Sequence, residues 1–322
     1  MPSSVDSTTA DTTTAVTGQT GQTGQTDQAG QAATAAPEPG AFQAEWDAWH
    51  ARHEEQRAAP HGFLAVTGLH FLDDAPQRIP GIPGLWNAVE DTVTITLSAV
   101  ERLSWEGREL NPDGTGSTTV LGPIAERDAV LLDHGRVQIE VARRGGFLVV
   151  RPRDPGYSLR AGYAGTPAYP ASEEFAVTAQ VEYFEQPQAV TVGAVVEGIE
   201  HVYESPARLR FTLGGQEHVL TAFNGYAPGT LNVLFTDLTS GDTTYPANRS
   251  LVVTPAEDGT AVLDFNRAVN LPCAYTDFAT CPLPPAGNRL PVAVEAGEKL
   301  PVERATADTP QAAATSEKEA AA

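Results

Sequence analysis

VQIEVARRGGFLVVRPR, residues 137–153, places two short apolar or alternating runs on either side of a Gly-Gly pair. Successive side chains of a strand point to opposite faces, so such runs are typical of strands in a packed sheet. Gly145 and Gly146 supply the positive φ that a tight hairpin turn needs. The stretch therefore predicts a β-hairpin.

Runs of the same kind recur along the chain and are divided by turn residues. They are FLAVTGLHFL (63–72), TVTITLSAV (92–100), FAVTAQVEYF (175–184), AVTVGAVV (189–196), ARLRFTL (207–213), LNVLFTD (231–237), SLVVTP (250–255) and AVLDFN (261–266). Turn signals stand between several of them: NPDG at 111–114, Gly-Gly at 214–215 and EDG at 257–259. We expect a mainly β fold, an antiparallel β-sandwich or barrel-like set of sheets. A parallel α/β sheet is disfavoured, because no long amphipathic helix separates the runs.

One amphipathic helix is predicted at residues 41–58. Phe42, Trp46 and Trp49 follow one another at spacings of four and three, and Pro60 ends the pattern. The sequence on both sides of the core lacks the apolar residues that ordering requires, so we expect residues 1–40 and 306–322 to be disordered tails. Residues 41–305 then form a single β-rich domain, with a sub-division near 166–174 as the alternative.

The net charge of −21 disfavours anionic partners. Such a field repels the phosphates of nucleic acid and of membrane surfaces. The sequence contains no apolar run long enough for a membrane span and no secretory signal, which makes the cytoplasm the expected location. Motifs for nucleotide, hydrolase or zinc-protease chemistry are missing, so we predict no cofactor. The remaining expected partner is a small-molecule ligand, and the oligomeric state stays open.

The last third of the chain carries the densest polar segments. FTDLTSGDTTYPANRSL at 235–251 precedes LDFNRAVNLPCAYTDFATCPLPPAGNRLPVAVEAGEK at 263–299. The second segment, together with VVRPRDP at 149–155 and SPARLRFTL at 205–213, resembles the bacterial and archaeal family called domain of unknown function 1684, over roughly residues 41–300. Leu271 departs from the pattern, which usually has a second proline there. The resemblance implies membership of a family whose biochemical role is not established.

Within these segments, Asp264, Asn266, Arg267 and Asn270 are the first ligand candidates. In an alternating strand, Asp264 and Asn266 point to the same face, and Arg267 can clamp a carboxylate or phosphate. Further ligand candidates are Asp237, Tyr245 and Arg249 in the neighbouring segment. The alternative is structural: Asp264 pairs with Arg267 or Arg249, and Asn266 and Asn270 hold the backbone of an irregular loop.

We predict no metal site. Asp237 and Asp242 around a TSG turn lack the spacing of a calcium loop, and a hairpin turn explains the same residues. Cys273 and Cys281 have no further ligand pair for zinc, and they read as buried thiols, with a disulfide as the alternative. His50 and His53 can share a helix face, which alone does not make a site.

Three hypotheses for function follow. The first is a β-rich module that binds a small polar or anionic ligand through the segments around 237–249 and 264–270, with Arg151 or Arg153 contributing. The second is a carboxylate-based hydrolase or lyase that uses Asp264 with a glutamate, Glu295 or Glu298, as an acid/base pair. The third makes the polar segments purely structural. The sequence leaves open whether the protein is an enzyme.

Overall fold

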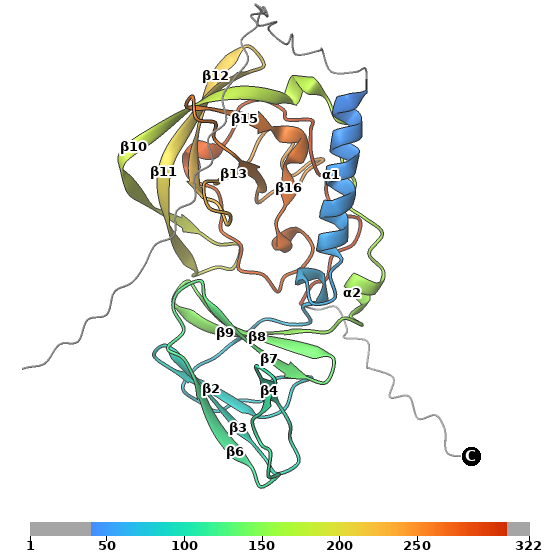
Figure 1. Cartoon of the computed structure of the whole chain (residues 1–322), viewed down its shortest axis with the longest axis vertical. Coiled ribbons are helices and arrows are strands. Elements are labelled where there is room, and N and C mark those ends of the chain that lie inside the picture. The colour runs from blue at the N-terminus through green and yellow to red at the C-terminus, as the bar shows by residue number, and fades with distance from the viewer. Residues whose placement is uncertain (1–39, 308–322) are drawn as a thin grey trace, which may run out of the picture. The chain divides into compact units, whose positions relative to one another are not determined.

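The structure, a computed structural model, describes residues 40–307 (Figure 1). The expected tails at 1–40 and 306–322 lie almost entirely outside these residues. The predicted helix is confirmed as α1, Ala41–Arg57. Trp46 is its buried aromatic residue, and the indole Nε1 donates to the carbonyl of Asn266 at 2.7 Å, 220 residues further along the chain. The apolar stripe therefore fixes α1 against the C-terminal part of the fold.

Three antiparallel sheets make up most of the remaining structure. A three-stranded sheet has the order β2 (Leu85–Val89), β3 (Thr92–Leu97), β6 (Ser117–Leu121). A six-stranded sheet has the order β1 (His70–Phe71), β9 (Phe147–Arg153), β8 (Val137–Arg144), β7 (Ala129–His134), β4 (Ser104–Trp105), β5 (Arg108–Glu109). One apolar cluster joins the two sheets: Val93 and Ile95 of β3 pack with Ile139 and Val141 of β8.

The third sheet has seven strands and its own core. The order is β15 (Thr260–Asp264), β10 (Ala176–Gly193), β11 (Glu200–Leu213), β12 (Gln216–Asn224), β13 (Leu231–Phe235), β14 (Arg249–Val253), β16 (Val269–Asn270). Its core includes Phe211, Phe235 and Phe265. The ring centroid of Phe265 lies 5.8 Å from that of Phe211 and 5.4 Å from that of Phe235. The mainly β, antiparallel fold with an N-terminal helix is thus confirmed.

Four of the predicted strand runs take a different form. The runs at 175–184 and 189–196 join in the single strand β10. The run at 63–72 begins with the 3-10 helix η1, Phe63–Ala65, and contributes only β1 to a sheet. The run at 261–266 leaves the strand at Asp264, because the Asp264 side chain accepts from the Asn266 backbone N–H and starts the 3-10 helix η3, Phe265–Arg267. Asp264 and Asn266 therefore do not share a strand face.

Short elements complete the described residues. They are α2 (Ser158–Ala161), η2 (Glu173–Phe175), η4 (Pro272–Ala274) and η5 (Ala286–Asn288). From residue 271 onward the chain is mostly irregular, and it packs across the sheets through side-chain and single-bridge contacts. Among residues 40–307, no helix is both long and apolar enough to cross a membrane.

Candidate functional site: an arginine-lined cleft

A cleft of about 630 Å³ lies between the six-stranded sheet and the irregular segment at 271–282. Residues from five parts of the chain line it: η1, the turn before β7, strands β8 and β9, the start of β11 with the loop after β12, and the segment at 271–282. Its charged lining residues are Glu126, Arg127, Asp128, Arg144, Arg151 and Arg153. A cleft of this size is typical of small-molecule sites.

The β8–β9 hairpin explains why arginines gather on one face. Gly145 and Gly146, both with positive φ, close a two-residue turn, and the resulting register places Glu140 opposite Arg151. Alternation then puts Glu140 and Arg144 of β8 on the same face as Arg151 and Arg153 of β9. The other face carries Ile139 and Val141 into the apolar core.

Glu140 is the centre of the charged face, and its side chain is only 5% exposed. Its carboxylate accepts from Arg151 Nη2 at 2.7 Å, from Arg144 Nη2 at 3.2 Å and from Arg153 Nη2. Burial would raise the pKa of Glu140, but the charges of Arg151 and Arg153 outweigh it and hold the pKa at about 2. One carboxylate thus neutralises one of three guanidinium charges.

Several donors of these arginines are not used by the protein. Nε of Arg151 and Nε of Arg153 are buried and have no hydrogen-bond partner among the described residues. Arg153 also donates through Nη1 to the carbonyl of His61 at 2.8 Å, which anchors its guanidinium. A buried donor without a partner is costly, and an anion is the kind of group that could satisfy these guanidinium donors.

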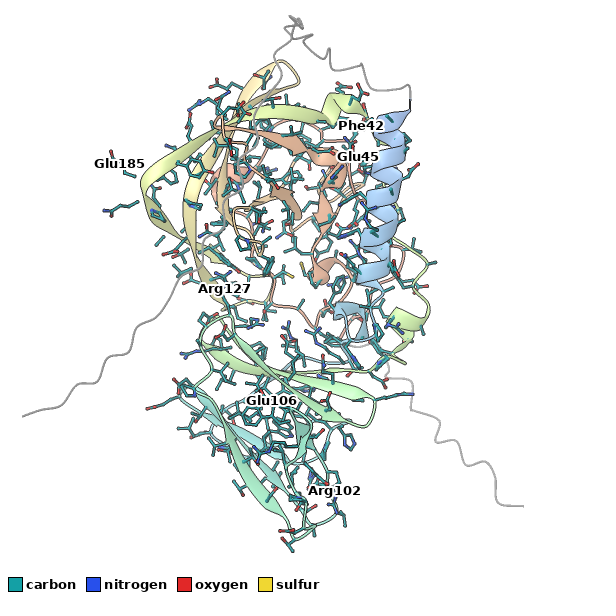
Figure 2. All side chains as sticks on the ribbon, viewed as in Figure 1. Phe42, Glu45, Arg102, Glu106, Arg127 and Glu185 are labelled. Carbon is teal, nitrogen blue, oxygen red and sulfur yellow. The ribbon has the colours of Figure 1, made fainter. Side chains whose placement is uncertain are left out.

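Arg127 adds a fourth guanidinium in an unusual backbone conformation. Its φ is +73°, at the third position of a turn closed by the Asp128 N–H on the Ala125 carbonyl at 3.0 Å. Glycine is the usual residue there, because a side chain at positive φ costs free energy. The guanidinium lies 4.6 Å from the ring centroid of Tyr203, and within residues 40–307 it makes no hydrogen bond or ion pair (Arg127 is labelled in Figure 2). Strain of this kind is concentrated at functional positions.

His201 contributes an acceptor to the cleft. The imidazole is 5% exposed, and Nε2 bonds to the carbonyl of Thr280 at 2.9 Å. A carbonyl only accepts, so Nε2 donates to it, and in the neutral imidazole Nδ1 is then an acceptor. Nδ1 is buried and has no partner among the described residues. The cleft therefore combines guanidinium donors with one imidazole acceptor.

Aromatic residues form the rest of the lining. Tyr203 contacts the guanidinium of Arg127 and the ring of Phe223, whose centroid lies 5.3 Å from that of Tyr203. Tyr226, in the loop after β12, is 99% exposed, and Phe278 comes from the C-terminal segment. Such rings can pack on a planar or apolar part of a ligand.

The first group of sequence-predicted ligand residues lies away from this cleft. Asp264 Oδ2 pairs with Arg267 Nε at 3.0 Å, and Arg267 also bonds Glu45 of α1 at 2.6 Å. The buried amide of Asn266 exchanges two hydrogen bonds with the Ser172 backbone, at 2.8 and 2.9 Å. Asn270 Nδ2 donates to the carbonyl of Lys299. These side chains connect segments far apart in the sequence.

The second group is equally enclosed. Asp237 and Arg249 form an ion pair at 2.8 Å with side chains 0% and 1% exposed, and Arg249 also donates to the carbonyls of Val294 and Ala296. Tyr245 is half-buried between two apolar clusters, and burial raises the pKa of its hydroxyl to about 12. Of the ligand candidates named from the sequence, Arg151 and Arg153 are the ones that line the cleft.

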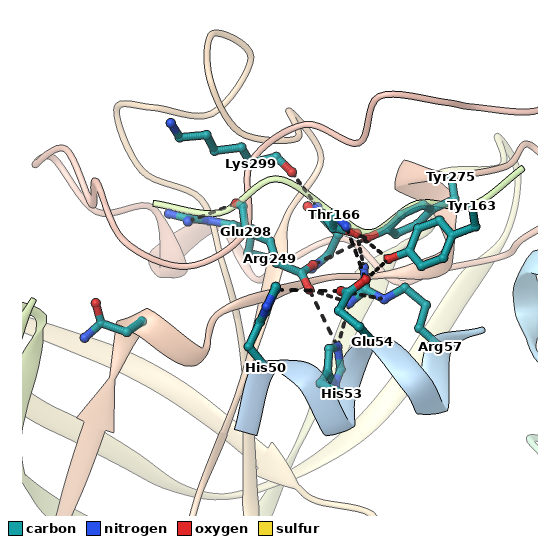
Figure 3. Close-up of polar contacts among 12 residues, drawn as sticks. His50, His53, Glu54, Arg57, Tyr163, Thr166, Arg249, Tyr275, Glu298 and Lys299 are labelled. Atoms are coloured by element: carbon teal, nitrogen blue, oxygen red, sulfur yellow. Dashed lines mark hydrogen bonds and ion pairs between the residues drawn. The ribbon is translucent and has the colours of Figure 1, made fainter. Parts of the chain in front are cut away.

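A second polar cluster joins α1 to the C-terminal segment (Figure 3). Glu298 is 1% exposed and accepts from Arg57 Nη2 at 2.5 Å and from the Asn270 N–H at 2.6 Å. Burial raises the pKa of Glu298 to about 7, against the opposing charge of Arg57. The predicted catalytic partner Glu295 is exposed, so the enclosed glutamate of EAGEK is Glu298.

This cluster also brings together groups that the sequence analysis did not combine. The ligand atoms of His50, Glu54 and Glu298 all lie within 4.8 Å of one another. His50 and Glu54 are four apart on α1, and both line a shallow hollow with Tyr163 and Thr166. Arg57, in contact with Glu298, already supplies positive charge where a cation would sit. The i, i+4 spacing was visible in the sequence, but the approach of Glu298 was not.

The family comparison concerns the second half of the chain. The model of the family described as protein of unknown function (DUF1684) matches residues 161–299. No curated protein matches. Among solved structures, an uncharacterised protein of Haloarcula marismortui, determined by solution NMR, is 34% identical over 44% of this chain and 78% of its own, with a TM-score of 0.37.

The matched residues include the C-terminal wall of the cleft, from Leu271 to Pro282, together with His201, Tyr203 and Tyr226. The arginine face of β8 and β9 precedes the matched range. The resemblance to the family of proteins of unknown function DUF1684 is thus confirmed for residues 161–299.

Proposed function

We propose that the protein binds a small anionic molecule in the arginine-lined cleft, with a carboxylate or phosphate on the arginines and an apolar or ring-shaped part against Tyr203 and Tyr226. One observation carries the proposal: three guanidiniums converge on the single buried carboxylate of Glu140 and leave buried N–H donors unpaired. The hypothesis of an anionic ligand is kept from the sequence, while its site moves from 264–270 to β8 and β9.

The strongly negative chain does not argue against an anion in this position. Long-range repulsion from exposed carboxylates is screened over about 8 Å at physiological ionic strength. Within the cleft, the nearest charges are the guanidiniums, and the low local dielectric strengthens their attraction to an anion. We therefore expect binding with a modest dependence on salt.

The lining also favours a ligand larger than a bare inorganic ion. A volume of about 630 Å³ exceeds what a single phosphate fills. The rings of Tyr203, Tyr226 and Phe278 offer apolar surface next to the charges. Nδ1 of His201 can accept from a hydroxyl or a protonated phosphate oxygen of the same ligand.

Isothermal titration calorimetry of the full chain tests this function with three matched probes: phenyl phosphate, inorganic phosphate and phenol. Phenyl phosphate should bind most tightly, since it uses both the arginines and the aromatic residues. Tyr226→Ala should weaken phenyl phosphate and leave inorganic phosphate unchanged. Arg52→Gln, which removes an exposed charge on α1, serves as the control and should change neither. Equal binding of phenol and phenyl phosphate would contradict the proposal.

A second candidate function rests on the Glu54–Glu298 pair. Glu298, with its pKa raised to about 7, can hold a proton near neutral pH, while Glu54 accepts from the Tyr163 hydroxyl beside the shallow hollow. Two carboxyl groups in such different environments suit acid/base work. A panel of nitrophenyl esters and glycosides tests it: turnover that both Glu54→Gln and Glu298→Gln abolish supports hydrolysis, and turnover unaffected by them refutes it.

A further inference from the structure

The two cysteines of the sequence lie together at the wall of the cleft. Cys273 and Cys281 are free thiols, 1% and 7% exposed, in one apolar cluster with Ala279. Val195, Tyr245 and Leu271 pack around them. Two thiols in one cluster differ from a lone buried cysteine, because they can react with each other.

The backbone holds the two residues in defined places. Cys273 lies in the 3-10 helix η4, and the Tyr275 N–H caps that helix on the Pro272 carbonyl at 3.0 Å. The carbonyl of Cys281 accepts from the Val195 N–H of the neighbouring segment at 3.0 Å. The chain between the two residues is thus folded back, which places both cysteines in one cluster.

The pair is asymmetric with respect to the cleft. Cys281 is one of the lining residues, next to Thr280, whereas Cys273 lies behind it and is not part of the lining. A small reagent that enters the cleft therefore reaches Cys281 first. The arginine face, including Arg151, lines the same cleft.

Electrostatics distinguishes the thiols in the same sense. The interaction between the two neighbouring thiols lowers the pKa of Cys281 and raises the pKa of Cys273. The charge of Arg151 acts on Cys281 in the same direction. Since the thiolate is the reactive form, Cys281 is the better nucleophile and Cys273 the better second thiol.

We propose that Cys273 and Cys281 are a modification site, a dithiol that a small hydroperoxide entering the cleft oxidises reversibly to a disulfide. In the first step the Cys281 thiolate attacks the distal peroxide oxygen, the O–O bond breaks, and the leaving alkoxide or hydroxide takes up a proton. Cys281 becomes a sulfenic acid, oxidised by two electrons, and the peroxide becomes an alcohol or water.

In the second step the sulfur of Cys273 attacks the sulfenic sulfur of Cys281. The S–O bond breaks, the hydroxyl leaves as water with the proton from Cys273, and the disulfide forms. A dithiol reductant reverses the change by thiol–disulfide exchange. The oxidised bond ties η4 to the cleft wall and fixes the segment between them.

The test uses the full chain, reduced and then treated with hydrogen peroxide. Intact mass should fall by two hydrogen atoms with no dimer, and alkylation under denaturing conditions should find no free thiol until dithiothreitol is added. Cys273→Ser should instead accumulate a sulfenic acid at Cys281 that dimedone traps. Cys281→Ser should react more slowly than Cys273→Ser by about tenfold or more, because the more ionised thiol has been removed.

Two results would overturn the proposal. One is a wild-type chain that keeps both thiols under peroxide that oxidises free cysteine in the same tube; the other is an equal rate for the two serine variants. The mass measurement on the wild-type chain still tests the proposal if a variant does not fold. No anionic ligand is present in the assay, so its failure is distinct from a failure of the proposed binding function.

Discussion

Replacing Arg127 by glycine should separate ligand binding from stability. Glycine at this positive φ removes the steric strain of a side chain, which should raise the free energy of unfolding by about 1 kcal/mol. The greater freedom of glycine in the unfolded chain costs about 0.4–1 kcal/mol. Loss of the stacking on Tyr203 removes about 0.5–1 kcal/mol. The free energy of unfolding should therefore change by no more than about 1 kcal/mol.

Binding should respond much more strongly. The Arg127 guanidinium makes no hydrogen bond or ion pair within residues 40–307, so its donors are available to the ligand. A charge-assisted hydrogen bond contributes about 1.5–3 kcal/mol. Because 1.4 kcal/mol is a tenfold change in Kd, the affinity for phenyl phosphate should fall by about ten- to a hundredfold.

Calorimetric titration and urea denaturation of the same samples measure both quantities. Glu106→Gly is the matched control, since Glu106 also has a positive φ, of 50°, and lies in the exposed β4–β5 turn (Figure 2). It should relieve backbone strain and leave binding unchanged. If Arg127→Gly binds phenyl phosphate as tightly as the parent, the assignment of Arg127 to the site is refuted.

Three further predictions concern stability. Asp237→Asn leaves Arg249 buried without its counter-charge and should lower the free energy of unfolding by about 3–5 kcal/mol in urea titrations. Removing the exposed Arg210 is the control and should barely change the urea midpoint. Equal effects of the two changes would contradict a stabilising role of the buried ion pair. Glu298 has a folded pKa of about 7 against 4.5 in the unfolded chain, so its stabilising contribution is present below pH 4.5 and is lost as the pH rises through 7. His53, with its pKa lowered to about 4, changes the stability in the opposite direction between pH 4 and 6.5. The measurement is therefore the difference in the free energy of unfolding between the parent and Glu298→Gln. This difference should change by about 3 kcal/mol from pH 4.5 to 7, and a constant difference would exclude the raised pKa of Glu298. Trp46→Ala should lower the free energy of unfolding by about 3–5 kcal/mol in urea titrations, because it removes the buried ring that joins α1 to Asn266. An unchanged thermal midpoint would show that α1 does not stabilise the domain.

Much of the fold follows from local sequence pattern. The Gly-Gly turn at 145–146 predicts the β8–β9 hairpin, and its two-residue length fixes the register that pairs Glu140 with Arg151. Carrying that register a few residues further would have placed Arg153 and Arg144 around the same glutamate. The arginine face was therefore readable from the sequence, although only Arg151 and Arg153 were named.

The rest depends on contacts that no local pattern specifies. The irregular segment 271–282 reaches the cleft through single contacts such as the Val195 N–H on Cys281, and Glu298 meets Arg57 across 241 residues. The alternation of AVLDFN predicted a shared face for Asp264 and Asn266, but the cap made by Asp264 turned the chain into a 3-10 helix. A side-chain hydrogen bond can thus end a strand that apolar alternation would extend.

The most direct test of an anion on the β8–β9 face is NMR of the arginine Nε–H groups during titration with phenyl phosphate. The account predicts saturable shifts for Arg127, Arg151 and Arg153, whereas Arg208 and Arg210 on the seven-stranded sheet stay unchanged. Shifts centred on Arg267, with Arg127, Arg151 and Arg153 unmoved, would contradict it and return the site to the segment around 264–270.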